Sequence, residues 1–227
     1  MQCDRHPRAA AHGEHCPACL IEAALAPEPA NSEPAGQAAA DRTCETRRLT
    51  VCVPLGATPR ASVFLVREGA ASPRLLRLKV WHAPAAPGFL ERFDDLRIRL
   101  ERWRGSPIAL PLAASLDPAG CPSVLSEFRQ GVPILDAVRA RRVKAGSAWT
   151  SIRPVIDVLM AMHEEGLGHG ALVSGNVLLE IGPGSTHLLD FGLAALLDPI
   201  SVPAAVTLSD RNGLAALGRE VRAVRRT

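Results

Sequence analysis

Hydrophobic and polar positions first form a regular pattern near residue 46, and from there they predict a sheet. Two runs rich in β-branched and aliphatic residues are separated by a Gly/Pro turn and followed by a third run, which predicts strands at 49–56 (LTVCVPLG), 61–68 (ASVFLVRE) and 75–81 (LLRLKVW). Two more runs joined by the turn DPAG predict strands at 108–116 and 122–128. We therefore expect five strands in the first half of the patterned region.

Helical spacing dominates the rest of the pattern. Residues 88–104 carry apolar side chains at 89, 93, 96, 100 and 103, so we expect a helix inserted after the third strand. Further helices are expected at about 133–144 and 148–165, with a last one from about Leu214. Between them, NVLLEI and THLLDF predict two short strands joined by the turn GPG. This order of elements is typical of an α+β protein.

Changes in composition divide the chain into four parts. Residues 1–26 are rich in Cys and His, and residues 27–45 are rich in Pro, Ala and polar residues, which is typical of a linker. The patterned region then divides into a strand-rich part, 46–130, and a mainly helical part, 131–227.

Charge and cysteine content exclude several classes of protein. A net charge of +3 is too small to argue for nucleic acid as a partner. No apolar run reaches the roughly 18–20 residues of a membrane span, and the first residues lack the apolar core of a signal peptide. Six unevenly placed cysteines favour a reducing, cytoplasmic location over a disulfide framework.

The N-terminal segment contains a candidate zinc site. Two ligand pairs, each with a two-residue gap, suit a tetrahedral ion, and they are Cys3, His6, Cys16 and Cys19. His12 and His15 lie between the pairs and compete for a ligand position, and a disordered Cys/His-rich tail is the alternative. Four protein ligands leave no open position, so such a zinc ion would stabilise a small partner-binding fold rather than catalyse a reaction.

The most informative segment is 167–192 (LGHGALVSGNVLLEIGPGSTHLLDFG). His169, Asn176 and the run from Asp190 to Gly192 fall at the spacing of the protein kinase motifs H-R-D-L-x-x-x-N and D-F-G. The segment resembles the core of Ser/Thr protein kinases, and the resemblance covers about residues 47–218. It implies a bilobal fold with a five-stranded antiparallel sheet and a helix in the first lobe, and a mostly helical, truncated second lobe. The alternative is a chance occurrence of the last motif at the end of a strand.

The same resemblance implies a site for ATP and Mg²⁺. Asn176 and Asp190 would bind Mg²⁺, and Lys79, one of only two lysines in the chain, would pair with the phosphates. The residues that would contact ATP are Gly56, Val63, Lys79, Glu127 and Arg129. Gly56 is the one glycine kept from the phosphate-covering turn of the family. The glutamate expected on the inserted helix has no clean match, since Leu96 or Arg97 falls at its position.

Two substitutions depart from the chemistry of the family. Ala171 occupies the position of the catalytic aspartate, and Val173 that of the lysine that supports the transferred phosphate. The resemblance therefore implies a catalytically impaired pseudokinase with a regulatory or scaffolding role, and a protein partner that covers the truncated second lobe. The alternatives are a weakly active ATP-dependent Ser/Thr protein kinase and a zinc-anchored partner-binding module without nucleotide.

Overall fold

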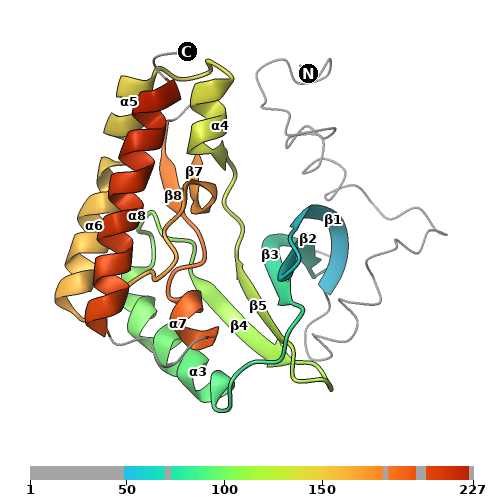
Figure 1. Cartoon of the computed structure of the whole chain (residues 1–227). Coiled ribbons are helices and arrows are strands. Elements are labelled where there is room, and N and C mark those ends of the chain that lie inside the picture. The colour runs from blue at the N-terminus through green and yellow to red at the C-terminus, as the bar shows by residue number, and fades with distance from the viewer. Residues whose placement is uncertain (1–48, 70–72, 181–183, 198–202, 225–227) are drawn as a thin grey trace. The chain divides into compact units, whose positions relative to one another are not determined.

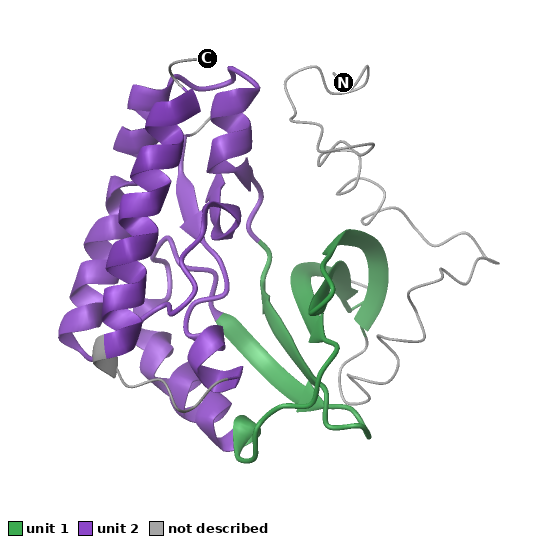
Figure 2. Ribbon diagram, viewed as in Figure 1, with its two compact units in different colours: residues 1–90, 111–128 green, residues 91–110, 129–227 purple. Residues whose placement is uncertain are grey.

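The computed structural model describes residues 49–69, 73–180, 184–197 and 203–224. The chain forms two compact units, residues 1–90 with 111–128 and residues 91–110 with 129–227 (Figure 2). The predicted zinc ligands Cys3, His6, Cys16 and Cys19 lie outside the described residues. None of the helices in the described ranges is both long and apolar enough to span a bilayer.

The first unit is built on the five-stranded sheet that the sequence predicts. Its strands are β1 (Leu49–Ala57), β2 (Ala61–Glu68), β3 (Arg74–Trp81), β4 (Pro111–Leu116) and β5 (Pro122–Glu127) (Figure 1). Every neighbouring pair is antiparallel, and the order is β1-β2-β3-β5-β4. The prediction of an antiparallel five-stranded sheet is therefore confirmed.

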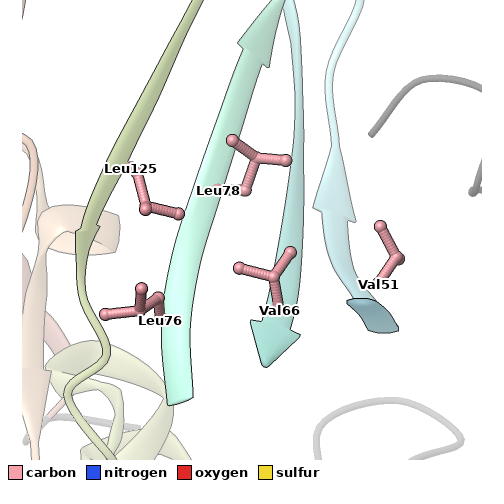
Figure 3. Packing of buried hydrophobic residues seen from close by; sticks show 5 residues of the cluster. All are labelled: Val51, Val66, Leu76, Leu78 and Leu125. Atoms are coloured by element: carbon pink, nitrogen blue, oxygen red, sulfur yellow. The ribbon is translucent and has the colours of Figure 1, made fainter. Parts of the chain in front are cut away.

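Side chains from four of these strands form the core of the first unit. Figure 3 shows the cluster, which consists of Val51, Val66, Leu76, Leu78 and Leu125. On β2, Leu65, the residue before Val66, is also fully buried and packs with Val53 in a second cluster. Because successive side chains of a strand point to opposite faces, the centre of the sheet is buried on both sides.

The helix after β3 belongs mainly to the second unit. Helix α3 (Phe89–Leu100) is followed by a 3-10 turn, η1 (Glu101–Trp103), and residues 91–110 group with the second unit, whereas the sequence placed them in the strand-rich part. Contacts within that unit explain the grouping. The Arg92 guanidinium donates to the backbone carbonyl of Leu196 at 3.0 Å, and the Arg99 guanidinium donates to the backbone carbonyl of Glu165 at 2.9 Å.

The second unit consists of a small antiparallel sheet and helices. The sheet has the order β6-β7-β8, formed by β6 (Val132–Pro133), β7 (Val177–Leu179) and β8 (Thr186–Leu188). The other described elements are α4 (Ile134–Arg139), α5 (Ala145–Ser151), α6 (Arg153–Glu164), η2 (Ser174–Asn176), α7 (Leu193–Leu197) and α8 (Pro203–Val224).

Two helix boundaries differ from the prediction. The helix expected at 148–165 is two helices, α5 and α6, and Pro154 in the first turn of α6 lacks the amide that would continue an unbroken helix. The last helix starts at Pro203 rather than near Leu214. A proline at the first helical position is favourable because its fixed φ suits a helix start, so Pro203 marks the true beginning.

Candidate functional site

The loop that carries His169 is fixed by hydrogen bonds to that buried side chain. His169 Nε2 donates to the carbonyl of Leu189 at 2.7 Å, and its Nδ1 accepts the amide of Ala171 at 3.1 Å. This pair of bonds requires the neutral ring with its proton on Nε2. The ring also meets Phe191 edge to face, with centroids 5.8 Å apart. The histidine thus joins its own loop to the segment that carries Asp190.

A buried carboxylate from α8 holds the start of the same loop. Asp210 is fully buried, and its two oxygens accept the backbone amides of His169 at 2.7 Å and Gly170 at 2.8 Å. The ring of His163, on α6, contacts it at 2.9 Å. The sequence analysis predicted none of these contacts of Asp210 and His163. The available signal was an aspartate on the face of a helix that otherwise buries Val206, Leu217 and Val221.

The hairpin of β7 and β8 brings the two predicted magnesium ligands to the same end of the sheet. Val177 pairs with Leu188, and the amide of Leu189 donates to the carbonyl of Asn176 at 2.8 Å, so Asn176 lies beside the residue that precedes Asp190. The Asn176 side-chain nitrogen donates to the carbonyl of Ala171 at 3.0 Å. Its amide oxygen is therefore the side-chain atom left to accept or to coordinate.

Asp190 has an unusual backbone conformation for a residue with a side chain. Its φ is +58° and the residue is buried, while Gly192 two residues later has a φ of +72°. The positive φ of Gly192 favours glycine, and a Cβ there would lie 2.9 Å from the methyl carbons of Leu96. Leu96, one of two candidates for the position of the missing glutamate, thus packs against this segment. Strain of this kind persists where the surrounding structure enforces it and is typical of functional sites.

Ala171 and Val173, the two residues that differ from the kinase motif, have side chains that can neither transfer a proton nor carry a charge. Ala171 is exposed and has no acceptor beyond its backbone, and the Val173 side chain is 56% exposed. The exposure of both shows that the apolar side chains do not serve as core packing.

In the first unit, three of the predicted ATP-binding residues lie in one row across the sheet. Gly56 pairs with Val63 between β1 and β2, and Val63 pairs with Lys79 between β2 and β3. Residues in register across antiparallel strands point to the same face, so Val63 and Lys79 share one side of the sheet. The Lys79 ammonium lies 5.0 Å from the ring centroid of Trp81, which is within the range of a cation–π contact.

The turn between β1 and β2 is closed by a threonine. The Thr58 hydroxyl oxygen accepts the amides of Arg60 at 3.3 Å and Ala61 at 3.1 Å, and the Thr58 amide donates to the carbonyl of Ala61 at 2.8 Å. His82 adds contacts to the carbonyl of Pro59 at 3.2 Å and to the hydroxyl of Ser62 at 2.9 Å. The turn therefore uses its own amides internally.

Glu127 and Arg129 flank the connection from β5 to the second unit. Glu127 is the last residue of β5 and pairs with Leu76. The Arg129 side chain donates to the carbonyl of Ile108 at 3.4 Å. The role of their backbones in binding adenine stays a prediction.

Metal-ligand clusters are not found in the described part of the chain. No group of three or more His, Cys, Asp or Glu side chains there could hold a metal ion. Mg²⁺ does not require such a cluster, since it is commonly bound by one or two protein oxygens together with substrate phosphates.

Comparison with known proteins supports a fold rather than a close relationship. No family model matches the chain, and no curated protein matches it. The kinase domain of PknI from Mycobacterium tuberculosis, as a double mutant, is 23% identical with a TM-score of 0.58 over 75% of this chain and 71% of that one. Rad53 1–466 in complex with AMP-PNP is 16% identical with a TM-score of 0.60 over 77% of this chain and 47% of that one. The chain has a protein kinase-like fold.

Replacing Asp210 by Asn should destabilise the second unit. The change leaves one acceptor for two amides and places an NH₂ group against an amide donor, so we expect a loss of about 2–3 kcal/mol in the free energy of unfolding. Urea denaturation followed by circular dichroism measures this loss. Glu220→Gln, an exposed change on the same helix, should stay within about 0.5 kcal/mol of the parent. Equal stabilities for the two variants would contradict the role given to Asp210.

Proposed function

We propose that the chain is a catalytically impaired protein kinase-like domain that binds ATP with Mg²⁺ and acts in regulation or as a scaffold. The observation that carries the proposal is the loop from His169 to Asn176. Its internal hydrogen bonds and the Asp210 anchor are intact, while the position that would supply the base is Ala171. The loop thus keeps its framework without the group that would accept the proton of a hydroxyl substrate.

The donor set at the end of the β7–β8 hairpin fits Mg²⁺. The Asp190 carboxylate and the Asn176 amide oxygen would hold the ion, and both are hard oxygen ligands of the kind that Mg²⁺ prefers. Bound there with ATP, the ion would neutralise phosphate charge. The positive φ of Asp190 supports the assignment, because a strained aspartate suits a binding role better than a packing role.

The first unit supplies candidate contacts for the nucleotide. Gly56, Val63 and Lys79 form a row across the sheet, and Lys79 would pair with the phosphates. Glu127 and Arg129 would hold adenine through their backbones. Because the Thr58 turn uses the amides that a glycine-rich turn would offer to phosphates, we expect weak affinity for ATP.

The replacements at Ala171 and Val173 remove two contributions to the rate. A positioned general base contributes about 10²–10⁴-fold, and loss of the cation beside the transferred phosphate removes further stabilisation. The retained metal ligands favour a second candidate, a weakly active ATP-dependent Ser/Thr kinase. The zinc-anchored module without nucleotide stays a third hypothesis, carried by residues outside the described ranges.

A regulatory role requires a protein partner, and the second unit offers apolar side chains that could meet one. Trp149 on α5, Met160 on α6 and Leu208 on α8 are each more than 40% exposed. Exposed apolar side chains of this size can contribute to a protein interface.

ATP with Mg²⁺ should raise the melting temperature of the full chain, because a ligand of the native state stabilises it by mass action. Millimolar ATP is expected to give a shift of about 1–3 °C, which follows from a dissociation constant in the high micromolar range. Lys79→Ala should abolish the shift, while Lys144→Ala, which alters the other lysine, should preserve it. If millimolar ATP did not change the melting temperature of the parent chain, the nucleotide proposal would be wrong, and the zinc-anchored module would become the favoured hypothesis.

Radiolabel transfer from γ-labelled ATP separates the first two candidates. We expect the purified chain to show no transfer to itself or to a generic Ser/Thr substrate above the level of Asp190→Ala. Robust transfer that Asp190→Ala removes would identify an active kinase and overturn the assignment of impaired catalysis.

Thr58→Ala should tighten the binding of ATP. The change frees the amides of Arg60 and Ala61. A hydrogen bond from one of them to a phosphate contributes about 0.5–1.5 kcal/mol, so the dissociation constant should fall at least about two- to tenfold. Isothermal titration calorimetry measures the change. Ser62→Ala is the matched control, since it removes a hydroxyl at the start of β2, next to the turn, without freeing either amide. Weaker binding by Thr58→Ala would show that the closed turn favours the nucleotide.

A further inference from the structure

A groove of about 350 Å³ in the second unit has no part in the nucleotide proposal. It lies where the segment after η1, the junction of α5 with α6 and the start of β8 meet, with the side chain of Arg129 in its wall. All of its described lining residues belong to the second unit. Its walls therefore come from one compact body.

The chemistry of the lining is that of an anion site. None of its described lining residues is Asp or Glu, and the basic side chains are those of Arg129 and His187. Three serines, Ser106, Ser151 and Ser185, also line the groove. The Ser106 hydroxyl accepts the amide of Ile108 at 3.3 Å, whereas those of Ser151 and Ser185 make no hydrogen bond within the described residues. The described lining thus contains two hydroxyl groups and a guanidinium, and none of its side chains is a carboxylate.

His187 lies in a partly buried position beside both a positive and a negative side chain. Burial lowers the pKa of His187, the positive charge of Arg129 lowers that pKa further, and Glu180 acts in the opposite direction. The Glu180 carboxylate lies 3.7 Å from His187 Nε2, and the buried Nδ1 has no hydrogen-bond partner among the described residues. The α5–α6 junction contributes Thr150, Ser151 and Pro154, which carry no charge. An anion in the groove would lie beside the Arg129 guanidinium and the imidazole of His187, both of which line it.

We propose that this groove binds the phosphate group of a phosphorylated ligand, with the Arg129 guanidinium pairing with the phosphate oxygens and the hydroxyls of Ser151 and Ser185 donating to them. Arginine matches phosphate because its planar fork can donate two parallel hydrogen bonds. The volume exceeds that of an inorganic ion, so the groove also accommodates part of the molecule that bears the phosphate.

Thermal unfolding of the full chain with inorganic phosphate tests the proposal, with sodium chloride at equal ionic strength as the reference. The parent should gain stability with phosphate over chloride, and Arg129→Met should lose the gain. Arg153→Met is the matched control, since the Arg153 side chain is 74% exposed and pairs with Asp157. Lys79→Ala should keep the gain, which separates this site from the proposed nucleotide site.

A second variant keeps the proposal testable if Arg129→Met fails to fold. Ser185 is exposed, so Ser185→Glu should fold and should abolish the gain by placing a negative charge in the groove. The proposal would be overturned if phosphate stabilised the parent no more than chloride does. It would also be overturned if the extra stabilisation by phosphate survived in both Arg129→Met and Ser185→Glu. Glycerol phosphate and a short phosphoserine peptide, titrated separately, distinguish a small metabolite from a phosphorylated protein segment as the source of the phosphate.

The pH dependence of sulfate binding gives an independent readout. Sulfate keeps its charge between pH 6 and 8, while a bound anion would raise the pKa of His187 and so be favoured by its protonation. We expect binding to the parent to be about threefold tighter or more at pH 6 than at pH 8, and His187→Gln to remove this difference. A pH dependence that is unchanged in His187→Gln would contradict the placement of the anion beside this histidine.

Discussion

The organisation of the second unit depends on one buried carboxylate. A charge removed from water is tolerated only when hydrogen bonds replace its solvation, and Asp210 receives two successive backbone amides and the ring of His163. Those amides belong to His169 and Gly170, so the anchor fixes the loop at its first residues. The His169 ring then reaches the carbonyl of Leu189 and carries the same constraint to the segment of Asp190. One acid on α8 thus aligns two segments that are distant in sequence.

The predictions from sequence succeeded where local pattern determines structure. Alternating apolar residues and turn signals predicted the five strands, and they also predicted the two short strands that form the β7–β8 hairpin. Helix boundaries were less accurate, because Pro203 was not recognised as a helix start. The partnership of His163 and Asp210 joins residues 47 positions apart. No local spacing encodes such a pair, since it arises only when helices pack.

The residues that hold the shape of the loop and those that differ from the kinase motif differ in burial. The groups that hold its shape, His169 and Asp210, are fully buried and hydrogen-bonded. The departing residues, Ala171 and Val173, are exposed and contribute no side-chain hydrogen bond that the structure records. Loss of a chemical group at an exposed position costs little stability, whereas loss of a buried anchor is expensive. A kinase-like framework by itself therefore does not establish phosphoryl transfer.

The threonine-closed turn also has a kinetic consequence. If phosphates and the Thr58 hydroxyl compete for the same amides, only molecules with an open turn are competent to bind, and the apparent affinity is reduced by the fraction that is open. Association would then be gated: its observed rate would level off at the rate of turn opening instead of rising with every increase in ligand concentration. The Thr58 hydroxyl would in this way compete with the phosphates for the two amides, and because it belongs to the same chain its effective concentration would be constant.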